Sequence, residues 1–383
     1  MALQMTMQQE QSRALLPEVL ATFCVFTTML DSGGELGLRS IGLLLLVVLC
    51  WRNPTVSFKS SMLIGWLAIV MLLLPSVLRS AFNGVELTNI LVWIYPFLFF
   101  PLIYIMARSS RLSERIFVNA GLCFALVIVL LFIGRITGDE RLMWLNDQLT
   151  AKASGFFNQK QAFFEDAMPV VYFQGTLSLV FVSILAIGRK RYFQYFVMLL
   201  ALILAPSRFG VTISILSAFV VFFVNLKTAK AQLASVLFAL FALTAGVLIL
   251  PNGFVEIFNH ESHGSRVRIG HVNSVEDVVE ADPTIALLGA GPGTSFYSSG
   301  FDEYTDNIEI SQLELLRKYG AVFFAALMTF FLALIVVLWR IRRRHTACAL
   351  IAQFIVATSN PVLLSSSFIL FLSVALSETE DVK

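Results

Sequence analysis

Residues 318–339 read KYGAVFFAALMTFFLALIVVLW, and no charged side chain follows Lys318 before Arg340. Crossing the hydrocarbon core of a bilayer takes roughly 20 apolar residues in a helix. This stretch therefore predicts a transmembrane helix. Apolar runs of the same kind recur along the whole chain of 383 residues, so they decide the fold. We expect an all-α polytopic membrane protein.

Composition agrees with that fold, since 57% of the residues are hydrophobic and only 14% are charged. A soluble domain of this length carries nearly twice that charged fraction. The apolar runs predict about twelve transmembrane helices in a single domain that covers residues 1–383. Their expected positions are 14–30, 37–51, 61–78, 88–107, 116–134, 167–187, 192–206, 209–226, 231–251, 318–339, 346–359 and 362–377.

The charged residues sort the connections between these helices into two sets. One set holds fourteen basic residues and a single acid, Glu114. Cytoplasmic loops of membrane proteins carry an excess of Lys and Arg, so we assign this set and both termini to the cytoplasm. A small loop, 135–166, and a large loop, 252–317, then face the periplasm or cell exterior. The basic residues are Arg52, Lys59, Arg108, Arg111, Arg115, Arg189, Lys190, Arg191, Lys227, Lys230, Arg340, Arg342, Arg343 and Arg344.

This sidedness excludes several classes of function. ATP and NAD are absent outside the cytoplasmic membrane, so the glycine-rich segment Gly289–Gly293 is not expected to bind a nucleotide. A turn that packs the loop against the helices is its favoured role, with a backbone nest for another phosphate as the weaker alternative. All four cysteines fall in apolar runs, which argues against disulfides and a thiolate metal site. The scattered basic residues give no indication of a nucleic-acid partner.

Arg208 is the only charged residue between Tyr192 and Lys227. An arginine inside a bilayer is costly, so its place between two predicted helices puts it at the outer surface or in a cavity open to that surface. One interpretation is an interfacial arginine that reaches lipid headgroups. The other is a cation that faces an enclosed anionic ligand, such as a lipid pyrophosphate.

Arg266 and Arg268 are the only Lys or Arg residues between Asn252 and Ile308, a segment that also contains nine Asp and Glu residues. Ion pairing with those acids is the simple interpretation. The alternative is phosphate binding, because a guanidinium holds phosphate through a planar two-pronged fork. Three histidines nearby, His260, His263 and His271, raise a zinc hypothesis, against surface histidines or a single ligand-contacting one.

The end of the large loop forms an amphipathic entry into the span that follows. Glu309 begins it, and its simplest interpretation is an interfacial helix. Asp306 and Asn307 lie just before its first turn, where a general base would meet a lipid-linked substrate. In the small loop, Asn158 and Lys160 either line a sugar or phosphate site or belong to a solvated loop.

Several of these segments together resemble the O-antigen polymerase and ligase superfamily of bacterial envelope biogenesis. Each motif is short, but their order and sidedness match over nearly the full chain. The departure is at Glu309, because the ligase branch typically has a histidine–asparagine pair at that spacing from Gly320. The matching segments are Ala153–Phe163, Ser207–Arg208, Ser265–Arg268, Leu288–Gly293 and Glu309–Gly320.

The resemblance implies a GT-C-like fold and a polysaccharide polymerase in the bacterial inner membrane. Such an enzyme transfers a growing glycan from undecaprenyl diphosphate to the non-reducing end of a lipid-linked repeat unit, without metal or cofactor. Its partners would be that lipid-linked oligosaccharide and membrane lipid, with room for a chain-length regulator. The catalytic residues would be Arg208, Arg266, Arg268 and Glu309, with His271 as a less favoured base. The substrate-binding residues would be Asn158, Lys160, His271, Tyr304, Asp306 and Asn307.

Two rivals remain. A ligase would move finished glycan to lipid A-core or another acceptor. A transporter or flippase of lipid-linked oligosaccharide would place ionisable residues near the bilayer midplane and often break helices there. The predicted helices hold almost none, apart from Glu18 and Arg208 near their ends.

Overall fold

The computed structural model describes residues 2–32, 36–51, 60–152, 171, 173–205, 207–225, 263–358, 360, 362–363 and 365–380. Within these ranges, the side chains of 2–15, 60–62, 150–152, 174, 208, 225, 263–265 and 380 are not described. The chain divides into two compact units, and each is considered by itself. Unit 1 combines Met1–Ser57, Leu102–Phe222 and Ser365–Lys383, and unit 2 combines Phe58–Pro101 and Phe223–Leu364.

Long apolar helices confirm the coarse prediction of an all-α membrane protein. Three described helices are long and apolar enough to cross a membrane: Leu63–Phe82, Glu114–Thr137 and Ser311–Arg340. A bent pair of helices, Leu87–Leu98 and Phe100–Ser109, would make a fourth, and seven shorter apolar helices accompany them. The count of twelve spans stays a prediction, and the span expected at 231–251 lies outside the described residues.

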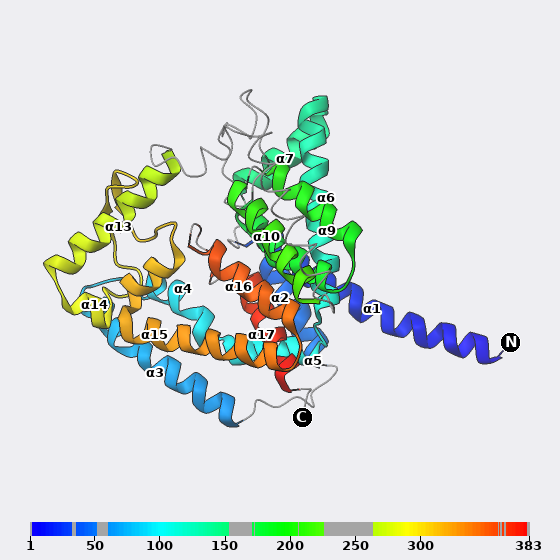
Figure 1. Ribbon diagram of the computed structural model, residues 1–383, viewed down its shortest axis with the longest axis horizontal. Coiled ribbons are helices and arrows are strands. Elements are labelled where there is room, and N and C mark those ends of the chain that lie inside the picture. Colours follow the sequence, from blue (N-terminus) through cyan, green and yellow to red (C-terminus); the bar gives the residue numbers. More distant parts are fainter. Residues whose placement is uncertain are drawn as a thin grey trace. The chain divides into compact units, whose positions relative to one another are not determined.

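Unit 1 contains ten described helical elements from three stretches of the chain (Figure 1). α7 falls inside the small loop 135–166, so part of that loop is helical. The expected positions of Asn158 and Lys160 lie outside the described residues. The elements are α1 Ala2–Leu30, α2 Leu38–Trp51, most of α5 Phe100–Ser109, α6 Glu114–Thr137, α7 Glu140–Lys152, η1 Gln174–Leu177, α8 Ser178–Gly188, α9 Tyr192–Leu204, α10 Arg208–Asn225 and α17 Ser366–Glu380.

Aromatic rings and small residues hold these helices together. Phe181 of α8 stacks on Phe371 of α17 with ring centroids 4.6 Å apart, and Phe117 of α6 packs against both rings. Ser183 and Ser214 share a buried hydrogen bond of 2.6 Å between α8 and α10. Hydroxyl pairs of this kind satisfy polar groups between membrane helices, where no water is available.

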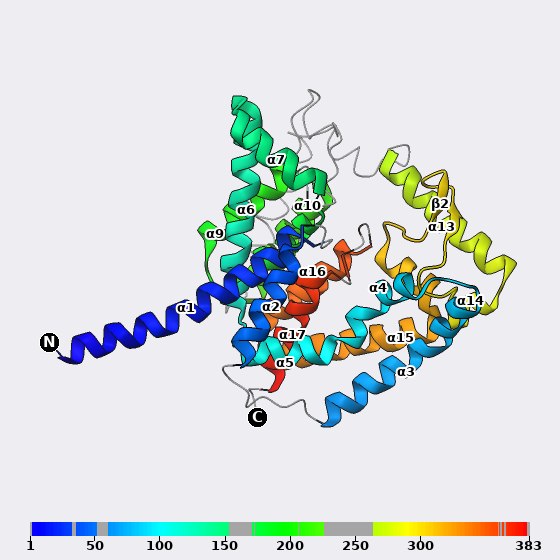
Figure 2. The same ribbon diagram turned by 180° about the vertical axis from the view of Figure 1, so that it is seen from behind.

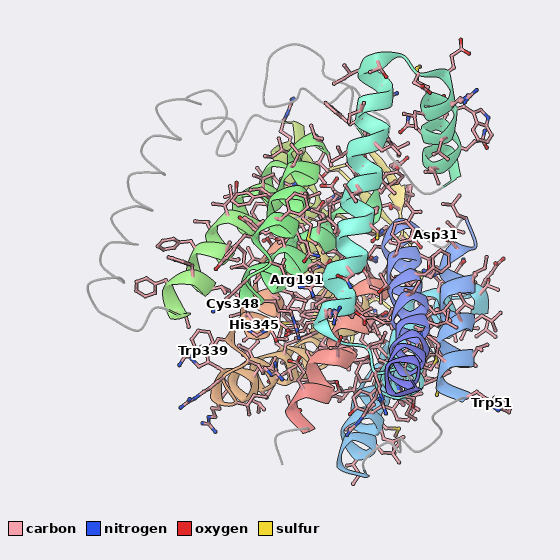
Figure 3. All side chains as sticks on the ribbon, turned by 90° about the vertical axis from the view of Figure 1, so that its right-hand side faces the viewer. Asp31, Trp51, Arg191, Trp339, His345 and Cys348 are labelled. Carbon is pink, nitrogen blue, oxygen red and sulfur yellow. The ribbon has the colours of Figure 1, made fainter. Side chains whose placement is uncertain are left out.

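The turn between α1 and α2 is ordered by a buried carboxylate. Asp31, labelled at the end of α1 in Figure 3, accepts hydrogen bonds from the backbone N–H groups of Leu36 and Arg39, each at 3.1 Å. These donors lie at the start of α2, where helical N–H groups have no partner within the helix. Asp31 therefore fixes the entry into α2.

Unit 2 contains the described part of the large loop and the helices that support it. α3 runs alongside α15, as Figures 1 and 2 both show. β1 and β2 form an antiparallel hairpin in which Tyr297 pairs with Tyr304. The elements are α3 Ser60–Phe82, α4 Leu87–Leu98, α13 His263–Ala281, α14 Thr284–Leu288, β1 Phe296–Ser298, β2 Glu303–Thr305, α15 Ser311–Arg340 and α16 Arg344–Val356.

The helix predicted over 88–107 is broken at Phe99 into α4 and α5, with a bend of 44°. Pro101 explains the break, because its nitrogen carries no hydrogen for the carbonyl of Phe97 four residues earlier. That carbonyl instead accepts a hydrogen bond of 2.7 Å from the indole Nε1 of Trp66. A side chain of α3 thus satisfies the backbone group that the proline leaves free.

The span predicted over 318–339 begins earlier, at Ser311, and is interrupted at Gly320. Gly320 has φ 81° and ψ 168°, which divides α15 into an entry helix, 311–319, and a longer helix that ends at Arg340. A side chain at this φ is strained, so glycine suits the position. The interruption turns the entry helix toward the large loop.

Candidate functional site

The described part of the large loop is folded around a small apolar core. Val275 of α13, Phe296 of β1 and Ile308 form this core, and Leu313 of the entry helix packs against it. Where α13 crosses the hairpin, a Cβ on Gly270 would meet the backbone of residues 299–300, so the two segments are in close contact. The loop is therefore docked on the start of α15.

The glycine-rich segment Gly289–Gly293 binds the end of the entry helix. The backbone N–H groups of Ala290 and Gly291 donate to the carbonyls of Arg317 and Lys318 at 2.7 and 3.0 Å. Gly289 has φ 82°, and a Cβ there would collide with the backbone of Lys318. These contacts agree with the predicted packing turn, since the segment satisfies carbonyls that the break at Gly320 leaves free.

A second contact ties the loop to α3. Arg79 forms an ion pair with Asp282, and its guanidinium also donates to the hydroxyl of Thr284 at 2.9 Å. The Thr284 hydroxyl and backbone, followed by Arg79, lower the pKa of Asp282 below its ordinary value. Close by in the same unit, the Ser80 hydroxyl donates to the carbonyl of Pro292 at 2.8 Å. Two helices, α3 and α15, thus hold the loop in place.

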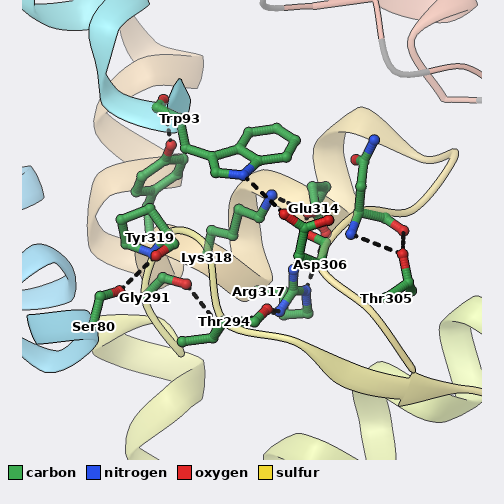
Figure 4. A network of polar contacts seen from close by, with 12 residues as sticks. Ser80, Trp93, Gly291, Thr294, Thr305, Asp306, Glu314, Arg317, Lys318 and Tyr319 are labelled. Atoms are coloured by element: carbon green, nitrogen blue, oxygen red, sulfur yellow. Dashed lines mark hydrogen bonds and ion pairs between the residues drawn. The ribbon is translucent and has the colours of Figure 1, made fainter. Parts of the chain in front are cut away.

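At the centre of unit 2 lies a buried cluster of three charged residues (Figure 4). Glu314, Arg317 and Lys318 are 5%, 1% and 1% exposed. Arg317 donates to both carboxylate oxygens of Glu314 at 3.0 Å, and its remaining donors reach the carbonyls of Thr294 and Asp306 at 3.1 and 2.9 Å. The Arg317 guanidinium also lies over the ring of Phe296, 4.4 Å from its centroid. Arg317 therefore joins the entry helix to both ends of the hairpin.

Lys318 shares the Oε1 oxygen of Glu314 with Arg317. Its Nζ forms an ion pair with Glu314 Oε1 at 2.5 Å and lies over the ring of Trp93 in α4. A small pocket of about 40 Å³ lies beside it. Trp93 also donates through Nε1 to Asp306 at 3.4 Å. The pocket is lined by Trp93, Asn307, Ser311, Glu314, Leu315, Lys318 and Tyr319.

Two of the predicted catalytic residues come together in this unit. Arg268, on α13, places its Nε 3.7 Å from Oε2 of Glu309, which precedes the entry helix. The two side chains are 40% and 38% exposed, while Nε of Arg268 itself is buried and has no hydrogen-bond partner among the described residues. Arg266 is exposed two residues earlier on α13. The distance is that of an ion pair without a hydrogen bond.

His271 points into the protein and not toward solvent. Its Nδ1 lies 2.8 Å from the hydroxyl of Ser298, and its ring meets the ring of Phe301 edge to face. Burial is the main reason that the pKa of His271 falls below its ordinary value of 6.5. The zinc hypothesis stays a prediction, because His260 and the side chain of His263 lie outside the described part of the chain. His271 itself joins α13 to the hairpin.

The remaining loop candidates have different surroundings. Tyr304 is 76% exposed on β2 and packs edge to face on Tyr297. Asp306 is exposed and accepts from Trp93, whereas the side-chain Oδ1 of Asn307 is buried. Asn307 thus lines the pocket beside Lys318, Asp306 contacts the pocket residue Trp93, and Tyr304 lies on the hairpin surface.

Three further candidates have side chains outside the described part of the protein. Arg208 is the first residue of α10 in unit 1, and its side chain is not described. Asn158 and Lys160 lie outside the described residues. Their predicted roles stay predictions.

The burial of Glu314, Arg317 and Lys318 was not predicted from the sequence. An interfacial helix would turn these charges to water, and that expectation is wrong for all three. The physical reason is tertiary: the hairpin and α4 cover the polar side of the entry helix. One signal was available, since Glu314 precedes Arg317 and Lys318 by three and four residues, the spacing of neighbouring groups on a helix.

Comparison with models of known protein families finds no match for this chain, and comparison with curated proteins finds none either.

Proposed function

We propose that this protein is a polysaccharide polymerase of the O-antigen polymerase type, acting on glycans linked to undecaprenyl diphosphate. The observation that carries the proposal is the meeting of Arg268 and Glu309, 3.7 Å apart. These residues belong to two different segments of the family resemblance. A third such segment, the glycine turn, bonds to the carbonyls of Arg317 and Lys318. Segments far apart in the sequence are thus neighbours, as residues of one site must be.

The reaction would proceed by direct displacement. The acceptor hydroxyl oxygen attacks the anomeric carbon of the donor glycan, and the bond from that carbon to the diphosphate oxygen breaks. The hydroxyl proton passes to the carboxylate of Glu309. The lipid diphosphate leaves as an anion, so no metal or nucleotide is needed to balance the step.

Arg266 and Arg268 would hold the departing diphosphate. Arginine suits this role because its fork matches two phosphate oxygens and it stays charged at all relevant pH values. Donors aimed at developing charge are commonly the largest source of catalysis. Arg208, which belongs to unit 1, keeps the catalytic role that the family resemblance implies for it.

The test uses purified full-length protein, lipid-linked repeat units and separation of the products by chain length. We expect Arg268→Ala and Glu309→Gln to lower the rate roughly 10²–10³-fold each. Glu276→Gln, which changes an exposed carboxylate on α13, is the matched control for Glu309. Long chains made at the normal rate by both variants would refute the proposal.

When the same variants are expressed in cells, the glycan on the final acceptor distinguishes a polymerase from a ligase. Single repeat units on the final acceptor indicate a lost polymerase, whereas an acceptor without glycan indicates a lost ligase. Chain extension by the purified protein in detergent excludes a transporter, because a micelle does not separate two aqueous compartments.

A further inference from the structure

The pocket beside Lys318 has no part in the reaction as proposed. It lies between the entry helix, α4 and the chain that leaves the hairpin, and Figure 4 shows the polar side chains around it. Its volume is about 40 Å³. That is room for a small group, since about 10–15 Å³ of such space holds one water molecule. The chemistry of the walls therefore decides what the pocket binds.

The charges around the pocket cancel. Arg317 and Lys318 are positive, and Glu314 and Asp306 are negative. Both arginine contacts to Glu314 are direct hydrogen bonds of 3.0 Å, so one positive charge is matched by that carboxylate. Asp306, whose carboxylate accepts from Trp93, offsets the charge of Lys318 at longer range than Glu314 does. With no surplus charge, the pocket suits a neutral polar group better than an oxyanion.

Two buried polar atoms beside this space have hydrogen-bonding capacity that no described residue fills. One is Nζ of Lys318, an ammonium with three donors, of which the ion pair with Glu314 at 2.5 Å occupies one. The other is Oδ1 of Asn307. The first is a donor and the second is an acceptor. Buried groups without partners are costly, so a ligand that satisfies both is favoured.

A hydroxyl group meets this requirement, because its oxygen accepts and its hydrogen donates. Asn307 and Ser311, which both line the pocket, stand two residues before and two after Glu309. The pocket therefore lies beside the segment that carries the proposed base. Leu315 and the ring of Trp93 add apolar walls, which suit the C–H groups of a sugar.

We infer that this pocket binds a hydroxyl group of a sugar, with Lys318 donating to it and Asn307 accepting from it. The inference deepens the proposed function, and rests on it in one respect: the sugar would be that of the acceptor repeat unit. Binding at this point would hold the acceptor next to Glu309.

The experiment measures binding of soluble sugars to the purified full-length protein by saturation-transfer NMR. The probes are the methyl pyranosides of glucose, galactose and mannose, together with their per-O-methylated forms, which lack hydroxyl donors. We expect at least one free glycoside to bind and its methylated form not to bind. Lys318→Met should weaken binding about tenfold or more, as expected for a hydrogen bond from a charged donor.

Asn307→Leu provides a second variant, in case Lys318→Met fails to fold, and should weaken the same glycoside severalfold. Gln312→Met is the matched control, because Gln312 is on the same helix but donates to the carbonyl of Phe354 and does not line the pocket. The inference is overturned if no glycoside binds, or if binding is unchanged in folded Lys318→Met and Asn307→Leu. Inorganic diphosphate that binds in place of the glycosides, and is lost in Lys318→Met, would overturn it too.

Chain extension, assayed in parallel, keeps the two proposals apart. Wild-type protein that makes long chains but binds none of the glycosides contradicts the pocket alone. Protein that binds a glycoside through Lys318 and Asn307 but makes no polymer contradicts the polymerase alone.

Discussion

The buried cluster predicts a clear order of stability among three variants. Glu314 is the carboxylate in direct contact with Arg317 and Lys318, which are both 1% exposed. Glu314→Gln keeps the size of the side chain but removes its charge. Two buried cations then lose their closest counter-charge, whereas Lys318→Met leaves the Glu314–Arg317 pair intact with both of its hydrogen bonds. The first change should therefore be far more damaging than the second.

The magnitudes follow from the cost of leaving buried charges unpaired. Removing one partner of a buried ion pair costs about 3–5 kcal/mol. Glu314 serves two cations, so we expect Glu314→Gln to lie near the upper end, about 5 kcal/mol. Lys318→Met should cost about 1 kcal/mol or less, because it replaces a cation by an apolar chain of similar length. The double variant should recover about 2 kcal/mol relative to Glu314→Gln alone, since one of the unpaired cations is gone.

The assay is unfolding of the purified protein in mixed detergent micelles, followed by intrinsic fluorescence, for the wild type and the three variants. A double-mutant cycle then gives the coupling between Glu314 and Lys318. Two outcomes would refute the reasoning. One is Glu314→Gln within about 1 kcal/mol of the wild type, and the other is equal destabilisation by Glu314→Gln and Lys318→Met.

Three further predictions test the loop and its sidedness. Gly289→Ala should cost about 2 kcal/mol or more, measured as a lowered Tm, because a Cβ there meets the backbone of Lys318. Gly138→Ala is the control, since Gly138 has a positive φ but open space around it, and it should cost about 1 kcal/mol. Equal effects of the two changes would contradict the packing role of Gly289. His271 is buried with a lowered pKa, so the unfolded chain takes up a proton at this histidine at a higher pH than the folded chain does. The contribution of His271 to the free energy of unfolding should be constant above pH 6.5 and fall as the pH drops toward the folded pKa. His271→Gln should lose that slope when unfolding is measured against pH. Glu276→Cys should react with a membrane-impermeant maleimide in intact cells and Arg342→Cys only after permeabilisation, and the reverse pattern would invert the assigned topology.

The sequence was a good guide wherever the signal was local. Long apolar runs predict helices, and the runs at 61–78 and 116–134 correspond to α3 and α6. The sequence was a poor guide where a distant group decides the outcome. The break at Phe99 needs Pro101, which is visible in the sequence, but also Trp66, whose indole satisfies the freed carbonyl from another helix.

The candidate site follows the same division. Arg268 and Glu309 stood out because each is a charged residue in a short motif, and both lie on the surface of unit 2. Lys318 and Glu314 did not stand out, because a polar stripe at helical spacing is equally typical of a solvated face. The burial of the cluster depends on three other segments: Thr294 and Asp306 bond to Arg317, and the ring of Trp93 covers Lys318. No pattern within the entry helix carries that information.

The ion pair between Arg268 and Glu309 bears on how the proposed reaction could begin. The two side chains are about two-fifths exposed and 3.7 Å apart, too far for a hydrogen bond. Exposed pairs of this kind contribute at most about 1 kcal/mol. A diphosphate offers Arg268 several charged oxygens at once, and a two-pronged contact to phosphate is stronger than this pair. On the proposed mechanism, the diphosphate of the arriving donor would therefore draw Arg268 away from Glu309. The Glu309 carboxylate would then be free to accept a proton only after a donor with its leaving group has bound.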